Sequence, residues 1–271
     1  MRVEADRLGI RVHVLRPADD PRELAREAAE AGADLLGMAG GDGSLASVAS
    51  VALDHDLPLV VVPLGTRNHF ARDLGVDPDD AVGALAAFGG TELRVDTGFV
   101  GDRLFLNNVS LGLYASFVHD PRRKTRNRLL AFLRMVPAAL GPARRPLDLS
   151  FVVEGRREHR AALAVLVANN DYRFESMADL GERTRLDRGL LYAYVVEAVG
   201  RRALVGLLVR AAIADVDQGE GLVAWSSERF SVESPRPRIH AAIDGEPVVL
   251  DSPLEFEIRP RSLRVLLPPA A

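Results

Sequence analysis

The chain has 271 residues, of which 48% are hydrophobic and 27% charged, and its formal net charge is −4 at pH 7. This length allows one large domain or two ordinary ones, and the composition is that of a globular protein with a sizeable core. The charge argues against a dedicated nucleic-acid binder, and the absence of cysteine excludes disulfides, thiolate zinc sites and cysteine nucleophiles. No apolar run reaches the ~18 residues that span a bilayer, so we expect a cytoplasmic protein.

Strand and helix patterns alternate over the first third of the chain. Asp20 is a plausible N-cap for a helix that begins at Pro21. The expected elements are a strand at Val12–Leu15, a helix at Pro21–Ala31, a strand at Asp34–Ala39, a helix at Ser44–Leu53, a strand at Leu57–Val62 and a helix at Asp79–Phe88. Such alternation predicts a parallel sheet that binds its ligands at the carboxyl ends of the strands.

After about residue 92 the pattern changes to strands joined by hairpins. The expected elements are hairpins of Arg94–Val100 with Leu104–Val109 and of Leu147–Glu154 with Ala161–Ala168, a strand at Leu190–Val196, a helix at Arg201–Ala214, and short strands over 229–267. This pattern is typical of an antiparallel sandwich or barrel. We therefore predict an α/β domain at 1–92 and a β-rich domain at 93–271, with the last strands as candidates for returning to the first domain.

The first glycine-rich turn, Gly40-Gly41-Asp42-Gly43-Ser44, follows one predicted strand and opens a helix. Glycine lets the backbone approach a ligand closely, and the free N–H groups at a helix start favour a phosphate. A carboxylate at Asp42 would oppose a phosphate by itself, so it suggests a nearby Mg²⁺ or a hydrogen-bonded role. The alternative is a tight turn with Ser44 as its N-cap.

The second turn, Pro63-Leu-Gly-Thr-Arg-Asn-His-Phe-Ala71, follows the next predicted strand. Thr66 and Asn68 offer a hydroxyl and an amide where a parallel sheet would present a ligand, although either could simply cap the loop. Two such turns on neighbouring strands favour phosphate binding over two unrelated tight turns. Neither turn has the pattern of a Walker loop or of a dinucleotide fingerprint.

Taken together, the two turns resemble the diacylglycerol kinase catalytic-domain family, which includes bacterial lipid kinases and sphingosine kinases. The resemblance continues downstream over nearly the whole chain. The matching segments are Asp96-Thr-Gly98, Phe105-Leu-Asn107, Ser110-Leu-Gly112 and Asp244-Gly-Glu246. It implies an α/β domain like those of NAD kinases and phosphofructokinases, followed by a mainly antiparallel β-sandwich domain. From the residues alone, Asp244-Gly245 is also typical of a hairpin turn.

The resemblance implies an ATP-dependent lipid kinase that phosphorylates a hydroxyl of a diacylglycerol-like or other amphipathic lipid. Glu246 matches the family's general base, with Asp244 beside it. The positions that match its nucleotide site are Gly40, Gly41, Asp42, Gly43, Ser44, Leu45, Ala46, Thr66 and Asn68. Asp42 and Asp96 match positions associated with Mg²⁺, and Asp187 is a third candidate. Positioning, charge neutralisation and a carboxylate base are what phosphoryl transfer needs.

The sequence departs from the family pattern in four places. Ser44 replaces Thr, His69 replaces Asp, and Arg188 replaces an Asp that binds a structural Mg²⁺, with Asp187 displaced by one residue. The family's first strand and its Asn-Pro-x-x-Gly turn would precede the helix that ends near Gly9. Without that strand we expect an exposed sheet edge. These departures keep open a non-catalytic nucleotide- or lipid-binding homologue, and the first glycine turn is also used by kinases of NAD or sugar phosphates.

Between the predicted hairpins, Arg122–Arg145 contains eight basic residues and no acidic one. Such a stretch is most often a solvated face. For an enzyme with a lipid substrate, its arginines could meet anionic headgroups while Leu129, Phe132 and neighbouring apolar residues insert shallowly. We therefore expect transient contact with an anionic membrane surface and a peripheral location, with no nucleic-acid partner. The oligomeric state is not predicted.

Overall fold

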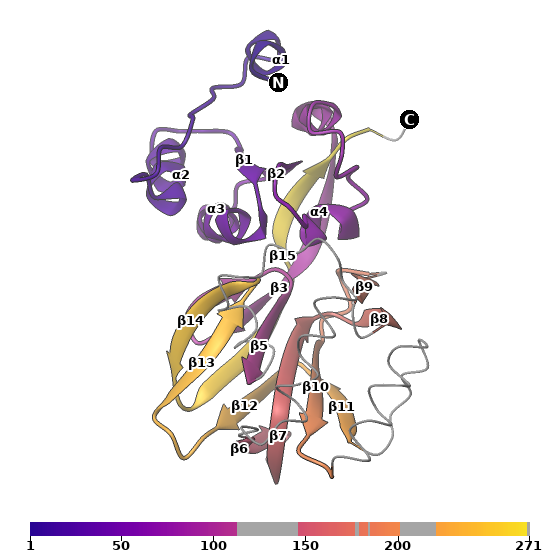
Figure 1. The fold of residues 1–271 in the computed structure, drawn as a ribbon. Helices are drawn as coiled ribbons and strands as arrows, with labels where there is room; N and C mark the ends of the chain where they lie inside the picture. Colours follow the sequence, from indigo (N-terminus) through magenta and orange to yellow (C-terminus); the bar gives the residue numbers. More distant parts are fainter. Residues whose placement is uncertain (113–145, 177–178, 184, 201–220, 270–271) are drawn as a thin grey trace. The chain divides into compact units, whose positions relative to one another are not determined.

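A computed structural model describes residues 1–112, 146–176, 179–183, 185–200 and 221–269 (Figure 1). The expected helix at Arg201–Ala214 and the basic stretch Arg122–Arg145 lie outside the described residues. The chain divides into two compact units, Met1–Thr97 with Arg259–Ala271, and Gly98–Ile258. It passes from one unit to the other within two strands, β3 (Thr91–Val100) and β15 (Leu254–Leu267).

The first unit alternates strands and helices. Its elements are α1 (Arg2–Arg7), α2 (Pro21–Glu30), β1 (Leu36–Gly40), α3 (Asp42–Asp54), β2 (Leu59–Pro63), α4 (His69–Asp73) and the 3-10 helix η1 (Gly83–Gly89). Strand β1 runs parallel to β2, with Gly40 opposite Pro63, and β15 pairs in parallel with β2 through Val265 and Leu266. The predicted parallel sheet is confirmed. None of the helices described in the chain is long and apolar enough to cross a membrane.

Local sequence explains the first unit's main elements. The carboxylate of Asp20 accepts the N–H of Arg22 at 2.8 Å, which caps α2 as predicted. All five residues of β2 are buried, as expected for a strand with a neighbour on either side in a sheet covered on both faces. Helix α3 buries Leu45, Val48 and Ala52 and packs against α2 and β1.

The second unit is an antiparallel β structure. Its strands are β4 (Arg103–Phe105), β5 (Asn108–Gly112), β6 (Leu147–Val153), β7 (Arg156–Asn169), β8 (Tyr172–Ser176), β9 (Asp179–Arg183), β10 (Leu191–Glu197), β11 (Leu222–Ser227), β12 (Arg229–Glu233), β13 (Arg238–Ile243) and β14 (Glu246–Asp251). Strands β12-β6-β7-β5-β13-β14 follow one another in the sheet, β10 pairs with β7 and β11, and β8 pairs with β9 (Figure 1). The described pairs in this unit are all antiparallel, as predicted.

The core of the second unit contains a chain of aromatic contacts. Phe151 lies edge-on to Trp225 with ring centroids 5.1 Å apart, Trp225 meets Phe230 at 6.3 Å, and Phe230 stacks on Phe256 at 5.0 Å. Edge-to-face and offset contacts at these distances add to the free energy gained from area burial. Around them lie aliphatic residues of β5, β7, β10 and β13, so the strands share one continuous core.

Three sequence-based expectations were wrong. No strand forms at Val12–Leu15, because its apolar side chains are exposed, Val14 by 63%, and gain no burial beside β1, which among the described strands pairs with β2 alone. The helix expected at Asp79–Phe88 is only the 3-10 turn η1, whose start is bonded to the carboxylate of Asp80. The strand expected at Leu104–Val109 is broken into β4 and β5 at a turn described below.

Truncating Phe151 tests the second unit's core. Phe151 is 1% exposed, so we expect Phe151→Ala to lower the free energy of unfolding by about 3–5 kcal/mol, from lost burial and the cavity it leaves. Val249→Ala is the control, because Val249 is 47% exposed and its change should stay within about 0.5 kcal/mol. Urea unfolding followed by tryptophan fluorescence measures both, and equal losses would contradict the assignment of this core.

Candidate active site

The two glycine-rich turns meet at the carboxyl ends of adjacent parallel strands. Gly40 ends β1 opposite Pro63, which ends β2, and the N–H of Leu64 donates to the carbonyl of Gly40 at 3.2 Å. The first turn leads directly into α3, whose N-cap is Gly41. This helix begins at Asp42, so Ser44 lies within its first turn and is not the N-cap.

Gly65 approaches Gly41 so closely that neither turn has room for a side chain at that point. A Cβ on Gly65 would lie 2.5 Å from the Cα of Gly41 and 2.7 Å from Oδ1 of Asn68. Real Cβ atoms do not come this close to backbone, so a side chain at position 65 would force the turns apart. Position 65 therefore requires glycine because there is no space for a side chain.

Asn68 holds the second turn in shape. Its Oδ1 accepts the N–H of Gly65 at 2.8 Å, and its Nδ2 donates to the carbonyl of Gly65 at 3.0 Å. The residue is 7% exposed and adopts the left-handed conformation, with φ of 51°, which Asn tolerates better than most residues. Thr66 beside it is exposed. Contact of either residue with a nucleotide stays a prediction, and the bonds of Asn68 indicate a role in holding the turn.

The carboxylate of Asp42 bonds the first turn to the second. It accepts the N–H of His69 through Oδ2 and that of Phe70 through Oδ1, both at 3.2 Å. These N–H groups open α4 and have no partner within that helix, so the carboxylate satisfies them. At the start of α3, the N–H groups of Asp42, Gly43 and Ser44 likewise have no acceptor within their own helix, and Gly41 has no side chain to supply one.

Asp244 and Gly245 form the turn between β13 and β14. Both have positive φ, 47° and 84°, as a two-residue hairpin turn of type I′ requires. The carboxylate of Asp244 accepts three backbone N–H groups, from Leu106 at 2.8 Å, Asn107 at 2.7 Å and Asn108 at 3.0 Å. These bonds hold the turn that separates β4 from β5, which is why the strand predicted there is interrupted.

Glu246 follows that hairpin turn directly. It is the first residue of β14, lies opposite Ile243 in the ladder, and has an exposed side chain. Among the described residues its carboxylate makes no hydrogen bond or ion pair, so it is available to a substrate. Glu246 and Asp42 belong to different units, and their approach in the active enzyme stays a prediction.

The other candidate acids have partners of their own. Asp96 is 1% exposed, and its carboxylate accepts the N–H of Arg261 at 2.7 Å. The carboxylate of Asp187 is paired with Arg185 through bonds of 2.9 and 3.1 Å. Within the part of the chain that the structure describes, no three acidic or histidine side chains gather where they could hold a metal ion. The metal roles of Asp42, Asp96 and Asp187 stay predictions.

A polar network that the sequence did not predict lies beside the Asp244 turn. Arg183 is 3% exposed and donates to the carbonyls of Leu106 and Asn169 and to the side chain of Asn107. The pair Asn169-Asn170 at the end of a strand was the available signal, because two buried amides need partners. Nothing in the sequence around Arg183 indicated that this arginine is buried.

Close to this network, Tyr194 donates from its hydroxyl to Asp171 at 2.9 Å. Burial, followed by the neighbouring carboxylate of Asp171, raises the pKa of Tyr194 well above its ordinary value. The hydroxyl therefore remains a donor at physiological pH and cannot serve as a base.

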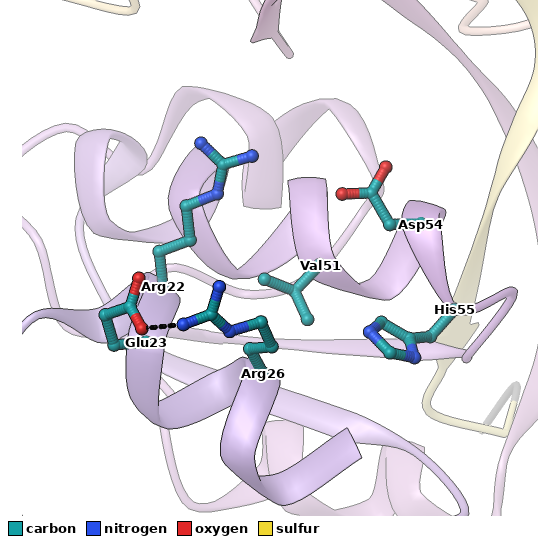
Figure 2. A pocket seen from close by; sticks show the side chains of 6 residues that line it. All are labelled: Arg22, Glu23, Arg26, Val51, Asp54 and His55. Carbon is teal, nitrogen blue, oxygen red and sulfur yellow. Dashed lines mark hydrogen bonds and ion pairs between the residues drawn. The ribbon is translucent and has the colours of Figure 1, made fainter. Parts of the chain in front are cut away.

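A hollow of about 290 Å³ in the first unit lies away from the glycine turns (Figure 2). Its lining is Arg22, Glu23, Arg26, Val51, Asp54 and His55. These residues belong to α2, to the carboxyl-terminal half of α3 and to its C-cap, whereas the first glycine turn precedes the other end of α3. Both arginines already have partners, since Arg22 donates to Ser50 and Arg26 pairs with Glu23. The hollow is therefore separate from the candidate site.

Two protein families match the chain, one over its N-terminal part and the other over its C-terminal part. The family described as diacylglycerol kinase catalytic domain matches residues 2–100, and the YegS C-terminal NAD kinase beta sandwich-like domain matches residues 121–267. The second match covers more than half of the chain, which therefore belongs to the family of the YegS C-terminal NAD kinase beta sandwich-like domain, and residues 2–100 match the diacylglycerol kinase catalytic domain. The protein is a kinase whose acceptor is an alcohol, as the resemblance of its motifs implied.

Individual relatives agree with this membership. The chain is 29% identical over 270 residues to the Pseudomonas fluorescens protein named "Probable lipid kinase YegS-like", an alignment that covers 96% of this chain and 86% of that one. It is 31% identical over 173 residues to a diacylglycerol kinase of Bacillus subtilis, covering 61% of this chain and 57% of the relative. A diacylglycerol kinase of Mycobacterium tuberculosis is 26% identical over 263 residues, covering 93% and 82%.

A solved structure has the same fold. It is a Bacillus anthracis protein described as "a putative diacylglycerol kinase", with a TM-score of 0.75 and 18% sequence identity over 98% of this chain and 91% of that chain. At this identity the likeness concerns the fold alone. It confirms the predicted combination of a parallel sheet in the N-terminal region with an antiparallel β-rich C-terminal region.

The contact of the two glycine turns can be tested at Gly65. We expect Gly65→Ala to weaken ATP binding by at least about tenfold, because the added Cβ would push the second turn away from Gly41 and misalign the N–H groups at α3. Gly89→Ala is the matched control, since a Cβ there meets nothing within 4 Å. Calorimetric titration with a non-hydrolysable ATP analogue measures the affinities. Equal affinities in the two variants would contradict the role given to this contact.

Proposed function

We propose that this protein transfers the γ-phosphoryl group of ATP to a hydroxyl of a diacylglycerol-like or other amphipathic lipid. The observation that carries the proposal is the junction of the two glycine turns, where Asp42 bonds the start of α3 to the start of α4. Backbone N–H groups at a helix start form a site for phosphate oxygens, and the helix dipole favours negative charge there. The match of residues 2–100 to the diacylglycerol kinase catalytic domain supports the lipid acceptor.

In this proposal, the backbone from Gly40 to Ala46 holds the phosphates of ATP, with Thr66 close to the nucleotide. Mg²⁺ is bound mainly by the phosphates and by one or two carboxylates, as is usual for this ion. Asp42 fits this requirement, because each of its oxygens accepts one N–H and retains a further lone pair. When bound, the ion would neutralise phosphate charge. Asp96 and Asp187 are the further candidates for contact with it or with its waters.

Glu246 is the proposed general base. Its carboxylate takes the proton from the acceptor hydroxyl while that oxygen bonds to the γ-phosphorus, and ADP leaves as the bond from the γ-phosphorus to the bridging oxygen breaks. Asp244 is less suited to this step, because its carboxylate already accepts three backbone N–H groups. We assign Asp244 to holding the hairpin turn from which Glu246 projects.

Replacing Glu246 tests the proposed base. We expect Glu246→Gln to lower kcat by about 10²–10⁴-fold, the usual contribution of a positioned base, with ATP affinity unchanged. Glu255→Gln is the matched control, because Glu255 is also exposed and also lies on a strand of the second unit. The assay follows ADP release with diacylglycerol or other lipid alcohols in mixed micelles.

The outcomes of this assay separate the candidate functions. Full activity of Glu246→Gln would refute the base assignment but leave the kinase in place. ATP and lipid binding by the wild-type protein without turnover would favour a non-catalytic binding homologue. Turnover with NAD or a sugar phosphate and none with lipids would favour a kinase of small alcohols.

We further propose that the basic stretch Arg122–Arg145 brings the enzyme transiently to an anionic membrane surface from the cytoplasm. Basic residues near such a surface each contribute about 1 kcal/mol of attraction, which salt screens. We expect the protein to sediment at low salt with vesicles that contain phosphatidylserine, and binding to weaken after replacement of Arg122, Arg123, Lys124 and Arg126 by Gln. Equal sedimentation with neutral and anionic vesicles would contradict an electrostatic contact.

A further inference from the structure

The turn between β4 and β5 is held by two charged side chains that come from distant parts of the second unit. Asp244 accepts the N–H groups of Leu106, Asn107 and Asn108 at 2.7 to 3.0 Å. Arg183, at the end of β9, donates to the carbonyl of Leu106 at 2.7 Å and to Oδ1 of Asn107 at 2.8 Å. The turn therefore carries hydrogen bonds to a cation and to an anion at once.

One peptide group of this turn receives both charges. The carbonyl of Leu106 and the N–H of Asn107 belong to the same planar unit, the first accepting from Arg183 and the second donating to Asp244. A cation at the oxygen and an anion at the N–H polarise the group in the same direction, so each bond strengthens the other. Because the unit is rigid, fixing its oxygen also fixes the direction in which its N–H meets Asp244.

Arg183 is itself held firmly. It is 3% exposed, makes a further bond to the carbonyl of Asn169 at 2.8 Å, and lies 5.6 Å from the ring centroid of Tyr172. Asn169, which is fully buried, also donates to the carbonyl of Leu106, at 3.0 Å. A buried guanidinium is costly unless its donors are satisfied, and here three short bonds satisfy several of them.

We propose that Arg183 is a positioning residue for Glu246, the proposed base. Arg183 fixes the peptide group between Leu106 and Asn107, this group fixes the carboxylate of Asp244, and Asp244 fixes the hairpin turn that Glu246 follows. The proposal rests on the proposed role of Glu246 and deepens it. Arg183 acts without touching the substrate, so its loss should alter the rate of the chemical step and leave nucleotide binding intact.

The first test measures how well the turn between β4 and β5 is held, by amide hydrogen exchange, and does not depend on enzyme activity. We expect Arg183→Met to accelerate amide hydrogen exchange at Leu106, Asn107 and Asn108 by at least about tenfold, because these N–H groups lose their fixed orientation toward Asp244. Arg160→Met is the control, since Arg160 is a partly buried arginine that is also hydrogen-bonded, but to Glu158 and Glu197 instead of the turn. Unchanged exchange in Arg183→Met would overturn the proposal, whether or not the wild-type protein is active.

The second test asks whether Arg183 acts through Glu246. We expect Arg183→Met to lower kcat by about 10–100-fold with the KM for ATP unchanged within about twofold. In a Glu246→Gln background the same substitution should change the residual rate by less than about twofold, because residues that act as a unit are not additive. An equal loss of kcat in both backgrounds, or no loss in the wild-type background, would overturn the proposal while leaving the kinase function standing.

If the Arg183→Met variant does not fold, Arg183→Lys provides a second test of the forked contact. Lysine retains the charge but lacks the planar fork that reaches Leu106 and Asn107 together. We expect intermediate values of both amide exchange and kcat. A lysine variant identical to wild type in both measurements would show that the forked contact is not needed and would also overturn the proposal. Absence of lipid kinase activity in the wild-type protein would refute the proposed function, and the exchange rates would then decide whether Arg183 holds the turn.

Discussion

The carboxylate of Asp42 joins the two glycine turns, and the arrangement of the proposed nucleotide site depends on this contact. Parallel strands place the turns at one edge of the sheet, but the bonds from His69 and Phe70 to Asp42 add a fixed link across 27 and 28 residues of chain. Gly41 and Gly65 can then lie in contact. The link also answers an electrostatic difficulty, because a carboxylate satisfied by the start of α4 opposes a bound phosphate less than a free one would.

The same arrangement, an aspartate carboxylate that accepts backbone N–H groups from a distant segment, recurs in the other acidic motifs of the chain. Asp96 accepts a backbone N–H from Arg261, 165 residues later in the chain, and Asp244 accepts three from the turn that begins at Leu106. Each of these aspartates therefore connects segments far apart in sequence. Hydrogen bonds from N–H groups to a charged acceptor are stronger than those between neutral groups, which suits them to fixing turns.

This arrangement changes how we interpret His69, which stands where the family usually has Asp. The contact of His69 with Asp42 is made by its backbone N–H. A change of side chain therefore leaves the link between the turns in place. Arg183 gives the opposite case, because its contribution lies entirely in its side chain and no backbone group could replace the forked donor.

The sequence by itself determined most of the elements and the family. Buried apolar runs predicted β1 and β2, and Asp20 with Pro21 predicted the start of α2. Two runs with Gly155-Arg156 between them predicted the hairpin of β6 and β7, whose turn lies one residue earlier, at Glu154-Gly155. These signals depend on neighbouring residues. Only the tertiary structure decided the rest. Val12–Leu15 has strand propensity but no partner strand, and β4 is separated from β5 because Asp244, far along the chain, bonds the turn between them. The burial of Arg183 and the contact of Gly41 with Gly65 were likewise hidden, because a contact between distant segments leaves no local pattern in either one.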